Sequence, residues 1–252
     1  MKTFLLSTLA AVTLSASCAA LAAPVNTVVL VHGAFADGSS WNRVIPQLQS
    51  HHLKVISVQL PLTSLQDDVA ATQRAIARAS GDVVLVGHSW GGTVITQAGN
   101  DPHVKGLVYI AAFAPNAGQS TGDLAGSFPA PAGSADIAKT ADGFLYLPAA
   151  TVAKDFAEDS PASQQKILSV TQGPIRAAAF GDKVSQAAWT QKPSWYLVSR
   201  QDRMINPDLE RAMAQHIHAH TRSVTASHTS MLSHPGSVAQ IITQAVDSSN
   251  AQ

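Results

Sequence analysis

The sequence predicts an α/β protein with a mostly parallel sheet, helices on both faces and an inserted helical lid. Short apolar, β-branched runs alternate with helical patterns over residues 26–113 and again over 194–246, as in parallel sheets that are covered on both faces. Residues 114–190 lack such runs and contain many Gly, Pro, Ala and Ser. A stretch of this length is uncommon as an ordinary connection. We therefore expect a core over 23–113 and 191–252 and a lid over 114–190.

The first part of the core contains four predicted buried strands, at residues 26–31, 54–60, 82–87 and 106–112. Ser39-Ser40 can cap a helix that runs to Leu48, and Pro46 is expected to shorten or kink it. Two further helices are predicted, one over 66–79 with an apolar side and one that includes 93–98.

The hydrophobic pattern is weak in the lid and clear again in the second part of the core. In the lid we expect a short strand at 144–147 and helices at 151–158 and 161–170. The buried pattern returns at 194–199. It is followed by a helix over 207–218, a strand near 222–226 and an amphipathic helix over 235–246.

The composition excludes several classes of protein. Of the 252 residues, 46% are hydrophobic and 13% are charged, which fits a substantial core and argues against disorder. The 16 basic and 16 acidic residues balance, so the basic surface of a nucleic-acid-binding protein is not expected. One cysteine can form neither an intrachain disulfide nor a cysteine-based zinc site.

Residues 1–22 have the order of a secretory signal peptide. Lys2 is followed by the apolar run 4–14 and by Ala20-Leu21-Ala22, a small-x-small pattern that predicts cleavage after Ala22. We expect export to the periplasm or the medium. A looser match to a lipoprotein signal leaves lipidation of Cys18 as an alternative. No later segment reaches 18 uninterrupted apolar residues, so no membrane span is expected in the mature chain.

The segment Gly87-His88-Ser89-Trp90-Gly91-Gly92 follows a predicted strand and precedes a predicted helix. This context is that of a nucleophile elbow, in which a strained turn exposes a serine hydroxyl. Gly87 and Gly91 leave room for the neighbouring chain. We therefore predict Ser89 as the nucleophile, the alternative being an inert serine in a strand-to-helix turn.

A serine hydroxyl requires a base, and the base requires an orienting group. Asp202 and His228 each follow a predicted strand, at the sheet edge where Ser89 lies, in the order Ser, acid, His that this arrangement uses. Asp208 and His234 are the alternatives. For the oxyanion we predict the backbone N–H groups of Trp90 and Ala34.

These motifs resemble the α/β-hydrolase superfamily, and within it the branch of plant methyl esterases, hydroxynitrile lyases and bacterial pyrethroid-hydrolase-like esterases. The resemblance rests on residues 29–35, 87–92, 195–202 and 227–235. It implies the α/β-hydrolase fold and a cofactor-free serine esterase that acts on small apolar esters through an acyl-enzyme. A small-molecule ester would be the partner.

Two positions depart from the hydroxynitrile lyases of this branch. Those enzymes carry Thr where this chain has Gly33, and Lys where it has Thr229. Because the Lys stabilises cyanide, its absence favours ester hydrolysis. An acyltransferase or perhydrolase, a lyase-like enzyme and a low-turnover ligand-binding protein remain alternatives.

The substrate pocket is predicted from apolar residues near the motifs and in the lid, for which core packing is the alternative. The candidates are Phe35, Phe113, Phe144, Tyr146 and Met231, together with Trp90. His216, His218 and His220 alternate but are expected to straddle a helix end, so no metal site is predicted. His32 is expected to order its own loop through hydrogen bonds.

Overall fold

The structure is a computed structural model that describes residues 24–251. The predicted signal peptide and Cys18 lie outside these residues. The core is a six-stranded parallel sheet in the order β2-β1-β3-β4-β8-β9, which confirms the predicted fold class. Its strands are β1 (Thr27–Val31), β2 (Lys54–Ser57), β3 (Val83–Ser89), β4 (Val104–Ala112), β8 (Ser194–Ser199) and β9 (His220–Val224).

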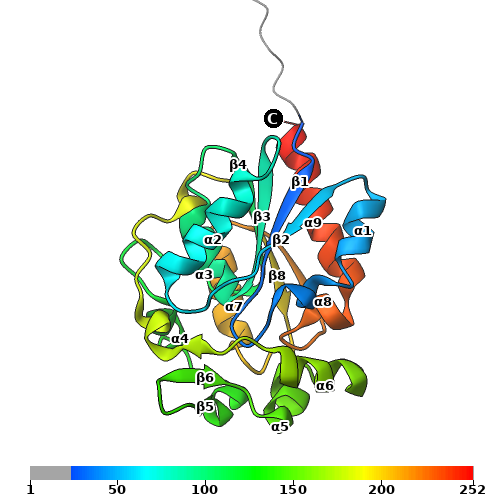
Figure 1. The fold of residues 1–252 in the computed structure, drawn as a ribbon. Coiled ribbons are helices and arrows are strands. Elements are labelled where there is room, and N and C mark those ends of the chain that lie inside the picture. The colour runs from blue at the N-terminus through cyan, green and yellow to red at the C-terminus, as the bar shows by residue number, and fades with distance from the viewer. Residues whose placement is uncertain (1–23, 252) are drawn as a thin grey trace, which may run out of the picture.

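Helices cover both faces of this sheet (Figure 1). One face carries α1 and α9, and the other carries α2 and α3. Every residue of β1, β3 and β8 is buried, which explains why these strands are continuously apolar rather than alternating. The helices of the core are α1 (Ile45–Ser50), α2 (Leu65–Ala77), α3 (Trp90–Ala98), α7 (Pro207–His216), α8 (Ser230–Ser233) and α9 (Pro235–Asn250).

The segment between β4 and β8 lies beyond the carboxyl ends of the core strands (Figure 1). It contains the short strand expected at 144–147, as the middle strand of an antiparallel sheet in the order β5-β6-β7. The two outer strands were not predicted, because two residues leave no readable alternation in a sequence. The elements are α4 (Thr121–Ala125), β5 (Ala138–Lys139), β6 (Phe144–Tyr146), α5 (Ala149–Thr151), α6 (Ala162–Thr171) and β7 (Ile175–Arg176). A π-helical turn, Val152–Phe156, follows α5.

Several element boundaries differ from the sequence expectation. Asp37, rather than Ser39-Ser40, caps the first helical turn, a 3-10 turn over Gly38–Trp41. The α-helix α1 begins only at Ile45, because Pro46 fits the first turn of a helix and not its interior. The edge strands are also shifted: β2 ends at Ser57 and β9 begins at His220.

Within 24–251, no helix is both long and apolar enough to cross a bilayer.

Candidate active site

Ser89 ends β3 and immediately precedes α3, so it lies on the sharp turn that the sequence predicts. Its backbone has φ 52° and ψ −120°, a conformation that a non-glycine residue adopts only at a cost. The turn is tight on both sides. A Cβ at Gly87 would come within 2.5 Å of the Gly91 carbonyl oxygen, and a Cβ at Gly91 within 2.5 Å of the Val31 carbonyl oxygen. Glycine is therefore required at both positions.

The Asp202 and His228 side chains meet beside this turn. Nδ1 of His228 lies 2.6 Å from Oδ2 of Asp202, and both side chains are buried. The second carboxylate oxygen, Oδ1, accepts the N–H groups of Met204 at 2.7 Å and Ile205 at 2.8 Å. These bonds fix the carboxylate. It in turn fixes the imidazole with Nδ1 as the donor, which leaves Nε2 free to act as a base.

The two alternative residues lie elsewhere. Asp208 is exposed in the first turn of α7 and pairs with Arg211. Nδ1 of His234 lies 2.9 Å from the Ser233 hydroxyl oxygen, and its Nδ1 is 3.8 Å from Asp159. Neither takes part in the contact that joins Asp202 to His228.

His228 is enclosed by aromatic rings. His88, the residue before the candidate nucleophile, donates from Nε2 to the His228 carbonyl at 3.0 Å, and the two ring centroids are 4.6 Å apart. Burial lowers the pKa of His88 well below its ordinary value. The neighbouring ring therefore stays neutral and does not oppose a positive charge on His228. Phe156 of the insertion covers another side, at 5.3 Å between centroids.

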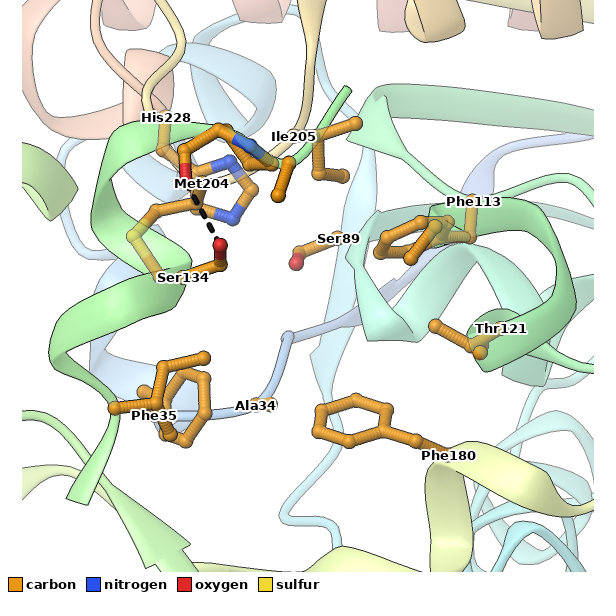
Figure 2. Close-up of a pocket in the computed structure, with 15 residues that line it drawn as sticks. Ala34, Phe35, Ser89, Phe113, Thr121, Ser134, Phe180, Met204, Ile205 and His228 are labelled. Atoms are coloured by element: carbon orange, nitrogen blue, oxygen red, sulfur yellow. Dashed lines mark hydrogen bonds between the residues drawn. The ribbon is translucent and has the colours of Figure 1, made fainter. Parts of the chain in front are cut away.

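Ser89 and His228 line one cavity of about 240 Å³. Figure 2 shows the Ser89 hydroxyl facing the space enclosed by Phe35, Phe113 and Phe180. Met204 and Ile205 complete one wall, and the insertion adds Thr121, Ser134 and Ile137. Apart from His228, none of the residues lining the cavity is ionisable. The cavity therefore suits an uncharged, largely apolar ligand.

Only part of the predicted pocket lines this cavity. Phe35 and Phe113 do, whereas Phe144, Tyr146 and Met231 do not. Phe144 packs under the guanidinium of Arg176, and Tyr146 is 38% exposed on the small sheet. Met231 is fully buried in the core. Sequence reasoning missed Phe180 and Met204. Met204 could have been found from its place two residues after Asp202, but nothing in the insertion marked Phe180.

The two oxyanion candidates lie in the turn after β1 and at the start of α3. Ala34 lines the cavity, in the turn after β1. Trp90 is the first residue of α3, and the first N–H groups of a helix have no partner within the helix. Its indole points elsewhere and donates to the buried Asp68 at 2.7 Å.

His32 holds the turn after β1 in place, as expected. Its Nε2 accepts the Leu60 N–H at 3.0 Å, so Nδ1 carries the proton and donates to the Gly33 carbonyl at 2.8 Å. Burial lowers the pKa of His32. The imidazole thus serves as a neutral bridge between the turn and the segment after β2.

Of the three alternating histidines, His216 and His220 make separate contacts. His216 contacts the Asn116 amide and His220 stacks on Trp195. Within residues 24–251, no group of three or more His, Cys, Asp or Glu side chains is arranged to hold a metal ion.

A parallel α/β sheet with Ser89 on an elbow, beside a buried His–Asp pair, defines a hydrolase of the α/β class. The comparison with known families agrees. The model of the Alpha/beta hydrolase family matches residues 28–241, so the chain belongs to that family.

Individual relatives are distant. The chain is 24% identical over 198 residues to "Probable hydrolase R7" of a Phoma species, covering 72% of this chain and 79% of that one. A pyrethroid hydrolase from Sphingobium faniae superimposes with a TM-score of 0.75 at 20% identity, covering 88% of this chain and 98% of the other. A methylesterase from Arabidopsis gives 0.75 at 18% identity, with 88% and 99% covered. The neighbours thus include both kinds of esterase named in the sequence resemblance.

Proposed function

We propose that the protein is an exported serine hydrolase that cleaves small, uncharged carboxylic esters through Ser89, His228 and Asp202. One observation carries the proposal: the strained serine and the imidazole held by Asp202 open into the same apolar cavity. The pyrethroid hydrolase and the methylesterase among the structural neighbours support an ester as the substrate.

In the proposed reaction, His228 Nε2 takes the proton of the Ser89 hydroxyl as the oxygen attacks the ester carbonyl. The N–H groups of Ala34 and Trp90 carry the negative charge that develops on the carbonyl oxygen. Asp202 stabilises the imidazolium. His228 then passes the proton to the departing alcohol, which leaves an acyl group on Ser89. Water, activated by His228, releases the carboxylic acid and restores the hydroxyl.

The cavity sets the expected range of esters. Its volume of about 240 Å³ lies below the usual range for drug-sized ligands. We therefore expect acetyl and butyryl esters to react faster than palmitoyl esters. We also expect neutral esters to react faster than esters that carry a carboxylate near the carbonyl, because no cation lines the cavity to pair with it.

The test compares the wild type with Ser89→Ala on p-nitrophenyl esters of increasing chain length and on aryl methyl esters. Ser163→Ala, an exposed serine of α6, is the matched control. A fluorophosphonate probe should label the wild type and the control on Ser89, located by peptide mass spectrometry, and leave Ser89→Ala unlabelled. An unlabelled wild type, or equal turnover by Ser89→Ala, would contradict the proposal.

Export is tested on the full chain. Expression of residues 1–252 in a bacterial host should give a product in the periplasm or medium whose N-terminus is Ala23. A cytoplasmic product with an intact N-terminus would exclude export. A product that starts at a lipidated Cys18 would favour the membrane-anchored alternative, and Cys18→Ala would separate the two.

A further inference from the structure

Glu210 is a fully buried acid directly behind the candidate triad, and the proposed reaction does not use it. It lies on α7, and its carboxyl group is 0% exposed. Oε2 accepts the Ser199 N–H at 3.0 Å. Oε1 is also buried, and among residues 24–251 the structure gives it no hydrogen-bond donor. An orphaned carboxyl oxygen at such a depth calls for an explanation.

The neighbouring acid is Asp202, and Ser199 links the two residues. The Ser199 N–H donates to Glu210 and the Ser199 carbonyl accepts the Asp202 N–H at 3.2 Å, and the Asp202 charge acts on the Glu210 carboxyl group. Two ionised carboxylates cannot share a buried site without strong repulsion, so the pair holds one proton between them. Asp202 already accepts three hydrogen bonds, from Met204, Ile205 and His228. Glu210 accepts one. The negative charge is therefore better stabilised on Asp202, and the shared proton belongs on Glu210.

The other groups that face Glu210 agree with this assignment. Tyr196 of β8 is buried, and its hydroxyl donates to the Ala112 carbonyl rather than to Glu210. Arg211, next to Glu210 on α7, is half-exposed and paired with Asp208. Burial and the Asp202 charge raise the pKa of Glu210 well above its ordinary value.

We propose that Glu210 is a positioning residue: as a neutral carboxylic acid it donates a hydrogen bond to Asp202 and keeps that carboxylate turned toward His228. The proposal rests on the proposed role of the Asp202–His228 pair. Donation from a neutral acid also draws charge from Asp202. Loss of this hydrogen bond should make Asp202 more basic and so stabilise the His228 imidazolium. The acidic limb of the kcat/KM profile should then move to higher pH.

Two substitutions separate this role from the alternatives. Gln at 210 keeps the shape of the neutral acid: its carbonyl can accept the Ser199 N–H and its N–H₂ can donate to Asp202. Leu keeps the volume but can do neither. Asp208→Asn, an exposed acid on the same helix, is the control for a general change in charge.

We expect Glu210→Gln to retain kcat/KM within about threefold and to leave the acidic limb in place. We expect Glu210→Leu to lower kcat by about tenfold and to move the acidic limb to higher pH by about half a pH unit, since the lost interaction is one hydrogen bond. An ionised Glu210 would give the opposite sign, because removing a negative charge would lower the limb in both variants. That result, or wild-type behaviour of Glu210→Leu, would overturn the proposal.

A second readout does not depend on turnover. At pH 8, Asp68 and Glu158, whose pKa values are raised to about 6 and about 7 respectively, are ionised. The infrared spectrum should then contain the C=O band of a buried carboxylic acid in the wild type and in Asp208→Asn, and lack it in Glu210→Gln. Absence of the band from the wild type refutes the protonated Glu210. If the band is present but no ester is cleaved, the proposed function fails instead.

Discussion

Replacing Gly33 with Ala tests how closely the turn after β1 packs against the turn that carries Ser89. A Cβ at Gly33 would lie 2.8 Å from Cβ of Ser89 and 2.9 Å from Nδ1 of His88. Carbon atoms in contact normally lie about 3.5–4.0 Å apart. The methyl group thus overlaps Ser89 by about 0.7 Å or more, and the buried elbow cannot yield by rotating a flexible side chain.

The turn after β1 must therefore move away, and Ala34, the next residue, moves with it. Oxyanion donors work within about 2.7–3.1 Å of the oxygen, and losing one lowers kcat by about 10²–10³-fold. We expect a fall of this size in kcat for Gly33→Ala, with a much smaller change in KM, because the donor acts mainly in the transition state. Overpacking should also lower the free energy of unfolding by about 1–3 kcal/mol.

The assay is steady-state hydrolysis of p-nitrophenyl butyrate, with urea unfolding of each variant to show that it is folded under assay conditions. Gly81→Ala is the matched control, because a Cβ there meets no atom within 4 Å. A Gly33→Ala enzyme with the kcat of the control would refute both the fit of the turn and the role of the Ala34 N–H. A rise in KM alone would place the effect in substrate binding instead.

The remaining predictions concern the cavity, the His228 loop and a buried charge. Phe180→Ala should raise kcat/KM for octanoyl relative to acetyl esters by about tenfold, whereas Phe144→Ala, outside the cavity, should leave the ratio unchanged. Asp159→Ala removes the acceptor of both the N–H and the hydroxyl of Ser227 and should lower kcat for every ester. The control Asp142→Ala, at an exposed position, should leave kcat unchanged. Equal kcat values for the two variants would show that the His228 loop keeps its conformation without Asp159. Burial raises the pKa of Asp68 to about 6, so over part of the pH range the unfolded chain is ionised at this residue while the folded protein is not. The free energy of unfolding should therefore fall by about 3 kcal/mol as pH rises from about 4 to above 6. Urea unfolding across that range should be flatter for Asp68→Asn, and parallel curves would refute the shift.

The sequence predicted the core and the proposed triad because their determinants are local. The strand at 194–199 is a continuous apolar run and appears at the predicted bounds. Ser89, Asp202 and His228 were each placed from the strand end they follow, and parallel strands bring such ends to one edge. The predicted contact between Asp202 and His228 needed no information beyond strand order.

The pocket could not be predicted in the same way, because its walls come from segments far apart in the chain. Phe144 and Phe180 are both aromatic residues of the insertion, and only Phe180 faces the cavity. The difference is set by how the small antiparallel sheet lies on the core. Glu210 was missed for a related reason: in the sequence it is an ordinary helix acid, and only burial against Asp202 makes it notable.

The insertion has two separable roles in this arrangement. Phe180 and Ile137 shape the space for the substrate. The segment 156–159 instead contacts the loop that carries His228, through the Phe156 ring on His228 and the Asp159 bonds to Ser227. A change in the first group alters the size of the cavity while the base stays in place, so it should change the ratio of rates between esters. A change in the second group loosens the base for every substrate, so it should lower all rates together. If His228 is the base, as proposed, an insertion that contacts both its loop and the cavity cannot be removed to widen specificity without loss of rate.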